Sequence, residues 1–292
     1  MKKYEIYTDL ACEAEVKHDS AKSGTEYYEE TIDGFNTAKL IVKDANGEEF
    51  TKKKRGTYIT VFCDMIHKID TERFDALSSL IAKQIASLTE NSLKTSPSCV
   101  LVAGLGNREI TADNIGPKAV DKLTVTRHIS LYNRKLFDSF SKVPLCAIAP
   151  GVLGQTGVET ADILMGMCKS ASPDLIIAID ALAARSTERL GTTVQISDSG
   201  IFPGSGIGNR RNEISFETMG IPVIALGIPT VVNSATLVYD ALNKAGCEKY
   251  DKELDYVLKS GTSFFVSPRE SDMISEKAAM LFAAAINELY LY

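Results

Sequence analysis

The hydrophobic pattern divides the chain at about residue 65. Before that point, the runs 39–42 and 58–62 consist mainly of the branched and aromatic residues that favour strands. Asn46-Gly47 lies between them and is a typical turn signal for a β-hairpin. We therefore expect the N-terminal part of the chain to be β-rich.

Beyond Thr71, helix patterns and strand patterns alternate. A first amphipathic helix is predicted from Thr71, because apolar residues recur there every three or four positions. The patterns that follow are a strand at 99–105, a helix near 116–136, a strand at 145–148, a helix from about 159, strands at 175–179 and 223–226, and a final helix after Ser267-Pro268. Near-continuous apolar strands of this kind are typical of parallel sheets covered on both faces. The alternation predicts an α/β fold, a three-layer sandwich with a largely parallel sheet.

Composition and charge argue against several classes of protein. The 292 residues are 45% hydrophobic and 24% charged, which is ordinary for a globular chain with a large core. A net charge of −6 argues against nonspecific nucleic-acid binding, which needs a positive surface. Six cysteines without a C-x-x-C pair argue against a zinc knuckle or a disulfide framework. Neither a leader nor an apolar run of 18 residues is recognisable, so we expect no membrane partner and a cytoplasmic location.

Two apolar runs each lead to an aspartate where a strand is expected to end. The run 175–179 continues directly into Asp180, and the run 98–107 feeds a loop that reaches Asp113. Open parallel sheets bind and react at the carboxyl ends of their strands. If the two strands are neighbours, the two carboxylates converge there and can share a proton or hold a metal, and either arrangement activates water. The pattern therefore predicts a hydrolase.

Each aspartate also has a purely structural interpretation. Asp113 precedes a helix expected to start near Pro117, so it is a candidate N-cap for that helix. Asp180 follows five buried residues, where a charge is costly unless it is paired, hydrogen-bonded or protonated. Because both occur at matching places in the predicted sheet, we favour the functional interpretation for the pair.

Two glycine-rich segments, 149–157 and 200–211, are expected to form loops on either side of the Asp180 strand. Backbone amides in such loops can hold an extended peptide or an oxyanion, although long loops are also common without a function. Glu159 also suits the first turn of a helix, and His128 also suits a structural role within a helix. The candidates for substrate binding or support are Gln155, Glu159, His128, Arg185 and Ser205.

Two other functions stay open on these residues. The segment 104–107, Gly-Leu-Gly-Asn, resembles the start of a dinucleotide fingerprint, but Arg108 and Glu109 stand where the third glycine is required. A noncatalytic nucleotide-binding module is therefore one alternative. The same segment with Thr-Arg-His at 126–128 suggests a peptidyl-tRNA hydrolase-like esterase, although its two motifs are far apart here and Ile129 follows the histidine.

Eight segments in the same order resemble the germination protease family of endospore-forming bacteria. They are 7–11, 56–60, 104–107 through Asp113 to 116–117, 125–128, 149–154, 178–183, 195–198 and 203–209. The resemblance spans nearly the whole chain. It implies an endopeptidase that degrades the small acid-soluble proteins of the spore during germination, in the cytoplasm of the spore core, and that assembles as a homotetramer. Its candidate catalytic aspartates match Asp113 and Asp180.

The resemblance also implies a zymogen that cuts itself. The segment 8–13, Thr-Asp-Leu-Ala-Cys-Glu, has the form of the family's cleavage sequence, in which an acidic residue precedes an apolar residue and alanine. We expect cleavage between Asp9 and Leu10, with a simple N-terminal strand as the alternative. The predicted parts are a propeptide over 1–9, a β-rich extension over 10–65 and an α/β catalytic core over 66–292.

The family resemblance extends to the fold and to the question of a metal. The fold is expected to resemble that of the hydrogenase-maturation proteases, or phosphorylase-like fold, in which carboxylates at matching positions hold a metal together with a histidine. Asp113 and Asp180 are therefore expected either to hold a divalent metal or to act as a metal-free pair. No other cofactor is expected. Asn233 stands where the family commonly has an aspartate.

Overall fold

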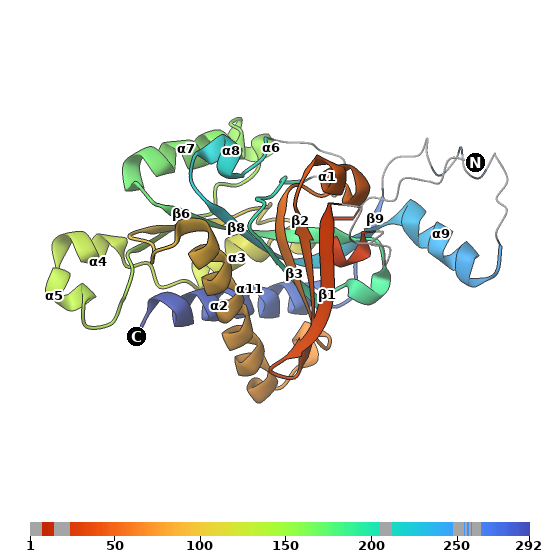
Figure 1. The fold of residues 1–292 in the computed structure, drawn as a ribbon, viewed down its shortest axis with the longest axis horizontal. Coiled ribbons are helices and arrows are strands. Elements are labelled where there is room, and N and C mark those ends of the chain that lie inside the picture. The colour runs from red at the N-terminus through yellow and green to blue at the C-terminus, as the bar shows by residue number, and fades with distance from the viewer. Residues whose placement is uncertain are drawn as a thin grey trace.

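The computed structural model describes residues 8–14, 24–204, 212–247 and 264–292, together with residues 254, 256 and 258. A nine-stranded sheet lies between two layers of helices, with α2 and α11 below it and α6, α7 and α8 above it in Figure 1. The strands are β1 (Thr25–Ile32), β2 (Phe35–Val42), β3 (Gly56–Phe62), β4 (Val100–Gly104), β5 (Leu145–Ile148), β6 (Leu175–Ala184), β7 (Thr193–Ser197), β8 (Val223–Asn233) and β9 (Phe265–Val266).

The helices differ widely in length. The α-helices are α1 (Ala45–Thr51), α2 (Thr71–Leu93), α3 (Ile115–Asp121), α4 (Arg127–Tyr132), α5 (Arg134–Phe137), α6 (Leu153–Thr156), α7 (Thr160–Ala171), α8 (Phe216–Met219), α9 (Ser234–Lys244) and α11 (Ser271–Tyr290). Short 3₁₀ helices are η1 (Ala11–Glu13), η2 (Ile66–Lys68), η3 (Thr111–Asp113) and η4 (Thr187–Arg189). Within the described ranges, no helix is both long and apolar enough to span a bilayer.

The sheet is parallel over one half and antiparallel over the other. Its order is β1-β2-β3-β7-β8-β6-β4-β5, with β9 paired to β8. The pairs β5–β4, β4–β6 and β6–β8 are parallel, whereas β7 and the three N-terminal strands pair antiparallel. The predicted α/β class is confirmed, and the parallel part of the sheet consists of β8, β6, β4 and the edge strand β5. The β-rich extension joins the same sheet through β3 and β7, and its separation as a domain stays a prediction.

Two apolar layers hold the helices on the sheet. One face of the central strands packs on α2, α3 and α11 through fully buried residues such as Leu77, Ile179 and Phe282. The other face packs on α7 through residues such as Leu101 and Leu164. The amphipathic pattern beyond Thr71 thus forms α2 as predicted, and Asp70 caps this helix by accepting the Arg73 N–H at 2.8 Å. Burial on both faces explains why the central strands are apolar at nearly every position.

Two predicted elements are wrong in detail. Asn46-Gly47 is not a hairpin turn, because Asp44 accepts the Gly47 N–H at 3.0 Å and starts helix α1 there. The hairpin turn lies instead at Asp33-Gly34, where both residues have positive φ. The single helix predicted near 116–136 is three short helices, α3, α4 and α5. Thr126 interrupts it, because this buried residue hydrogen-bonds to the start of β5.

Strands β6 and β8 are longer than their apolar runs predict. Strand β6 reaches Ala184 and pairs with β8 along this extension, although with a register shift between Leu182 and Ala183. Asp180 therefore lies within β6 and not after its end, which corrects the prediction. Strand β4 stops at Gly104, opposite Ile179, so β6 has one edge free of β4 from Asp180 onward.

Candidate active site

Asp180 lies where the edge of β6 separates from β4. Asp180 is only 5% exposed, and its Oδ1 accepts the backbone N–H of Ala181 at 2.9 Å. The preceding residue, Ile179, accepts the Leu105 N–H at 2.8 Å, which is the last link between the two strands. Asp180 is thus a buried carboxylic side chain at the carboxyl end of β4, the position at which open α/β sheets bind ligands.

Asp113 ends the short helix η3, which packs against β6 and β8. Its Oδ2 accepts the backbone N–H of Asn107 at 2.8 Å. The N-cap position of α3 belongs to Asn114, which makes no side-chain cap hydrogen bond. The alternative that Asp113 caps this helix is therefore wrong, and its carboxylate is oriented toward the loop that leaves β4.

Close backbone packing brings the two aspartates to the same corner of the sheet. A Cβ added to Gly104 would lie 2.2 Å from the Gly116 carbonyl oxygen, and one added to Gly116 would lie 2.5 Å from the Ile179 carbonyl oxygen. The start of α3 therefore rests directly on the backbones of β4 and β6. Thr230 of β8 ties η3 down by donating its hydroxyl to the Ala112 carbonyl at 2.6 Å. Asp113, three residues before Gly116, thus lies beside the end of β4, next to the part of β6 that carries Asp180.

This packing also accounts for the Gly-Leu-Gly-Asn segment. Gly104 is required by the contact with α3, and Gly106 adopts a φ of +108° that other residues rarely adopt. A Cβ at Gly106 would lie 2.0 Å from the Asp113 carbonyl oxygen. Both glycines therefore serve the approach of η3 and α3 to the strand ends.

Gln155 extends the hydrogen-bond network around Asp113. Its Nε2 donates to the Asn107 Oδ1 at 2.8 Å, and the same oxygen accepts the Glu109 N–H at 3.0 Å. Asn107 in turn donates its backbone N–H to Asp113. Gln155 is therefore connected to this carboxylate through a single intervening residue, Asn107. The structure brings this predicted site residue to the aspartates through helix α6.

Glu159 lies at the N-cap position of α7 but makes no capping hydrogen bond. Its Oε2 is buried and, in the part of the chain that the structure describes, has no hydrogen-bond partner. The carboxylate therefore does not perform the capping role that its position suggests. Glu159 lies between α6, which carries Gln155, and α7, and it stays a predicted support residue.

Of the other predicted support residues, His128 lies away from the aspartates. His128 is exposed on α4, and Thr126 fixes the start of that helix to Leu145, at the amino end of β5, with hydrogen bonds of 2.9 and 3.0 Å. That is the opposite end of the strands. Arg185 follows β6 on the same side as Asp180 and donates its backbone N–H to Glu13 at 2.7 Å. Ser205 lies outside the described residues.

The predicted cleavage sequence lies against the free edge of β6. Asp9 donates its N–H to the Ala183 carbonyl at 2.9 Å, and its Oδ2 accepts the Ala183 N–H at 2.7 Å. Leu10 is completely buried against Leu182 and Val232. Both residues are therefore within a few residues of Asp180 along the strand, which the sequence pattern gave no means of predicting.

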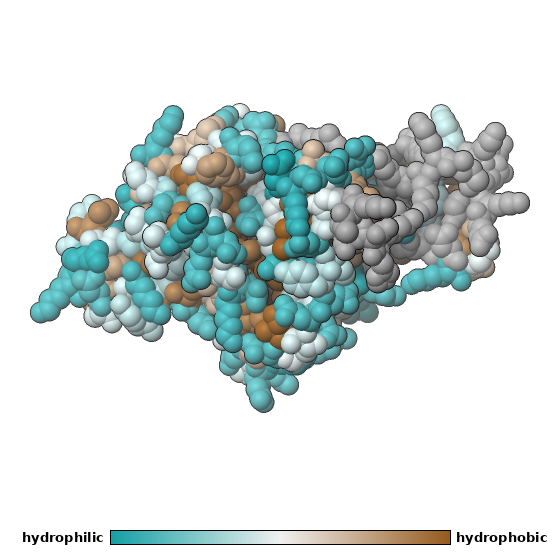
Figure 2. All heavy atoms as spheres, in the orientation of Figure 1, coloured by the Kyte–Doolittle hydropathy of each residue, from teal (hydrophilic) through white to brown (hydrophobic). Residues whose placement is uncertain are grey.

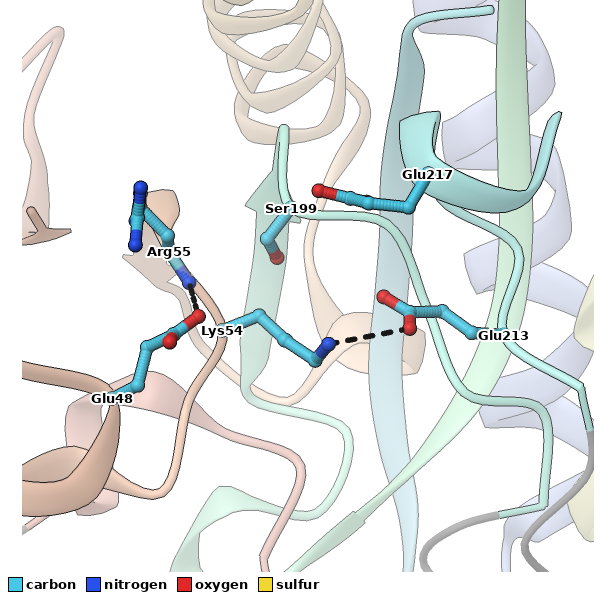
Figure 3. Close-up of a pocket in the computed structure, with 6 residues that line it drawn as sticks. All are labelled: Glu48, Lys54, Arg55, Ser199, Glu213 and Glu217. Carbon is cyan, nitrogen blue, oxygen red and sulfur yellow. Dashed lines mark hydrogen bonds and ion pairs between the residues drawn. The ribbon is translucent and has the colours of Figure 1, made fainter. Parts of the chain in front are cut away.

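A separate cavity of about 230 Å³ lies between α1, the start of β3 and α8 (Figure 3). Lys54 Nζ is 3.5 Å from Glu213 Oε2, and the Glu48 side chain accepts the backbone N–H of Arg55 at 2.8 Å. Neither candidate aspartate lines it. The mixed charges largely neutralise each other, so the cavity adds no chemistry to the site.

The donor set at the aspartates does not fit a transition-metal centre. Such a centre needs three or four ligands, and histidine or thiolate is usual among them. Among the described residues, no three His, Cys, Asp or Glu side chains are grouped so that they could hold a metal. We therefore derive no catalytic step through a metal.

Comparison with known proteins defines the class to which this fold and site belong. The germination protease family model matches residues 3–260, and the chain belongs to this family. Relatives described as germination proteases occur in Clostridium acetobutylicum, with 37% identity over 97% of this chain and 94% of theirs, and in Priestia megaterium, with 40% identity over 99% and 82%. A third, from Halalkalibacterium halodurans, is 41% identical over 89% of this chain and 69% of its own. The chain is therefore a protease with a role in spores.

A solved structure of a NiFe hydrogenase maturation protease from Thermococcus kodakarensis aligns with 67% of this chain and 94% of its own length. The sequence identity is 16% and the TM-score is 0.34. A similarity at that level is too low to support an argument about the site or the activity. The assignment to the germination protease family depends on the sequence relatives alone.

Proposed function

We propose that the chain is an endopeptidase that starts the degradation of small acid-soluble spore proteins, with water activated by Asp113 and Asp180. The observation that carries this proposal is the placement of both aspartates at the carboxyl end of β4, with Asp180 buried. Two distant segments of the chain meet there only because glycine backbones allow it. Burying an acidic side chain at this place is costly, which favours a functional reason for it.

We infer the chemistry from the behaviour of two carboxyl groups held at the same corner of the sheet. Placing two negative charges together is unfavourable, so the pair retains one proton over part of the pH range. The ionised carboxylate takes a proton from water, and the oxygen of that water attacks the peptide carbonyl. The protonated carboxyl group donates its proton to the leaving amine as the C–N bond breaks. Gln155 supports this site by fixing the Asn107 loop on which Asp113 rests.

The family resemblance also suggests how the chain is processed and how it assembles. We infer that the chain is made as a zymogen in the cytoplasm of the spore core and cuts itself between Asp9 and Leu10. The position of these residues against β6 supports the inference, because Asp9 pairs with Ala183, three positions beyond Asp180 on the same strand. We also infer a homotetramer. The exposed apolar residues Leu131 and Tyr132 on α4 are a surface that such an assembly would cover.

Peptide cleavage tests the proposed chemistry. A synthetic peptide that carries Thr-Glu-Ile-Ala-Ser-Glu is expected to be cut after glutamate by the purified protein. Asp113→Asn and Asp180→Asn each remove an ionisable group, so we expect each to lower kcat by roughly 10²- to 10⁴-fold. Asp75→Asn, an exposed position on α2, is the matched control and should leave kcat unchanged.

The same assay separates the two mechanisms. Incubation with a chelator, followed by its removal, should leave kcat unchanged if the aspartates act without a metal. Loss of activity on chelation, with recovery when one divalent ion is added back, would contradict the metal-free pair. A peptide that stays intact with the unmodified protein over the whole range from pH 4 to pH 8 would contradict the proposed function itself.

A further inference from the structure

The proposed reaction needs a hydrogen-bond donor that neither aspartate supplies. When the water oxygen attacks, an electron pair of the C=O double bond moves onto the carbonyl oxygen, which carries negative charge until the C–N bond breaks. One aspartate takes the proton of the water, and the other keeps its proton for the leaving amine. Donors fixed at such an oxygen are usually the largest single contribution to the rate. A complete site should therefore hold an N–H or O–H group beside the two carboxyl groups.

Several donors near the aspartates are already occupied. The Ala181 N–H donates to the aspartate before it on β6, and the backbone N–H of Asn107 donates to Asp113. The guanidinium of Arg108 forms an ion pair with Asp121 at the surface. These groups already have acceptors, so a substrate oxygen would have to compete for them.

The side-chain amide of Asn107 is held by its oxygen alone. Its Oδ1 accepts Gln155 Nε2 at 2.8 Å and the Glu109 N–H at 3.0 Å. A backbone N–H can only donate, so the atom facing it must be the amide oxygen, and the other must be the NH₂ group. Within the ranges that the structure describes, Nδ2 has no hydrogen-bond partner, and Asn107 is half-buried. The amide therefore presents N–H donors in a fixed orientation.

This amide lies on the same side of the sheet as the Asp180 side chain. On β6, Ile179 packs toward α2 and α11, whereas Ala178 packs toward α7. Side chains alternate along a strand, so Asp180 points to the α7 side. Gln155, which holds the Asn107 amide, belongs to α6 on that same side (Figure 1).

The amide is also close to both carboxyl groups along the backbone. The Leu105 N–H donates to the Ile179 carbonyl at 2.8 Å, so the chain leaves β4 directly beside Asp180. Asp113 accepts the N–H of Asn107 itself at 2.8 Å. Only the Cα, the Cβ and the amide carbon lie between that nitrogen and Nδ2. A peptide carbonyl held between the two aspartates is therefore within reach of this donor.

We propose that Asn107 is a further catalytic residue, whose Nδ2 donates to the carbonyl oxygen of the bond being cut and stabilises the negative charge that forms there. The inference rests on the proposed endopeptidase function. It assigns Gln155 as a positioning residue, which holds the amide with its N–H groups toward the site. Because the donor is in place before the water attacks, the charge forms without reorganisation of the site.

A sulfur atom in place of the carbonyl oxygen tests this donor, because sulfur is a weak hydrogen-bond acceptor. The peptide Thr-Glu-Ile-Ala-Ser-Glu is prepared with either atom at the Glu-Ile bond, and the ratio of kcat for oxygen to kcat for sulfur is measured. Asn107→Ala should lower kcat for the oxygen peptide roughly 10²- to 10³-fold with KM unchanged, and should lower the ratio by about tenfold or more. Asn91→Ala, at an exposed position of α2, is the matched control and should change neither.

The ratio distinguishes catalysis from a structural role. If Asn107 only supports the loop, its loss lowers kcat for both peptides equally and leaves the ratio unchanged. Gln155→Ala is the second variant, used in case Asn107→Ala does not fold, because Gln155 is exposed and its loss leaves the amide held by the Glu109 N–H. It should lower both kcat for the oxygen peptide and the ratio, by about threefold to tenfold.

The outcomes separate this inference from the proposed function. An unchanged ratio in folded Asn107→Ala, or in Gln155→Ala where the first variant does not fold, would overturn the role of Asn107 and leave the endopeptidase function in place. If the unmodified chain cuts neither peptide, the endopeptidase function is wrong, and the catalytic role of Asn107 is refuted with it.

Discussion

Single residues in this protein are placed by contacts that local patterns do not reveal. Asp113 resembled a helix cap, yet its carboxylate accepts the N–H of Asn107. Gln195 has no sequence signal beyond being a polar residue in a strand, although its carboxamide holds two backbone groups of the N-terminal segment. Asn233 accepts the Ala235 N–H at 2.9 Å, a bond that an aspartate would make equally well. The asparagine at this position therefore makes the same local hydrogen bond as the aspartate that the family commonly has there.

Asp198 gives a prediction about pH at the residue scale. Burial raises the pKa of this carboxyl group, and the Thr57 N–H, donated to Oδ1 at 2.6 Å, opposes the shift. A raised pKa means that the folded state loses stability as the pH rises from about 4 through the folded pKa. Asp198→Asn keeps an oxygen for Thr57 and removes the charge. It should raise the Tm at pH 7 and have no such effect at pH 3.

Thermal unfolding of both proteins between pH 3 and pH 7 checks this expectation. Asp75→Asn is again the control, and its difference from the unmodified chain should not vary over this range in the same way. If Asp198→Asn lowers the Tm at pH 7, the carboxylate stabilises the fold and the direction of its pKa shift is wrong.

At the scale of elements, the sequence predicted the parts whose signals are local. The strand expected at 145–148 matches β5, and the helix expected from 159 begins as α7 at Thr160. The extra length of β6 could not be predicted, because it depends on pairing with β8 and not on an apolar run. Strand β7 was not anticipated at all. The expected convergence of the aspartates was conditional on β4 and β6 being neighbours, and these two strands do pair in parallel.

At the scale of elements, substituting Gly104 tests whether the close packing of α3 on β4 is needed to assemble the site. Gly104→Ala would place a methyl group 2.2 Å from the Gly116 carbonyl oxygen, which is backbone and cannot rotate away. The start of α3 must then move off the strands, at a cost of about 2 kcal/mol or more in the free energy of unfolding. Because η3 moves with it, we expect peptide cleavage to fall as well.

The control for this change is Gly166→Ala in the exposed middle of α7, where an added Cβ meets no atom within 4 Å. That substitution should raise the free energy of unfolding by about 1 kcal/mol, because alanine favours a helix. Urea unfolding of both variants measures the difference. A Gly104→Ala chain as stable and as active as the unmodified one would show that α3 does not need this close contact.

Over the whole molecule, the N-terminal segment connects parts of the sheet that are otherwise separate. It contacts β6 through Asp9, β7 through Gln195, and β2 and β3 through η1. Hydrophobic side chains gather over α7 and α8, as Figure 2 shows. Exposed Phe216 and Met165 belong to these two helices and offer an apolar surface on the α7 face of the sheet.

Removal of the first nine residues is the prediction for the molecule as a whole. In the docked segment, Asp9 pairs with Ala183, three positions beyond Asp180 and thus about 10 Å along β6. Cleavage between Asp9 and Leu10 therefore requires the segment to shift toward the aspartates, so maturation should be slow compared with cleavage of a free peptide. Mass spectrometry during incubation at mildly acidic pH should show loss of residues 1–9, and Asp180→Asn should prevent it. Cleavage at another bond, or equal loss in the Asp180→Asn chain, would contradict self-processing by this pair.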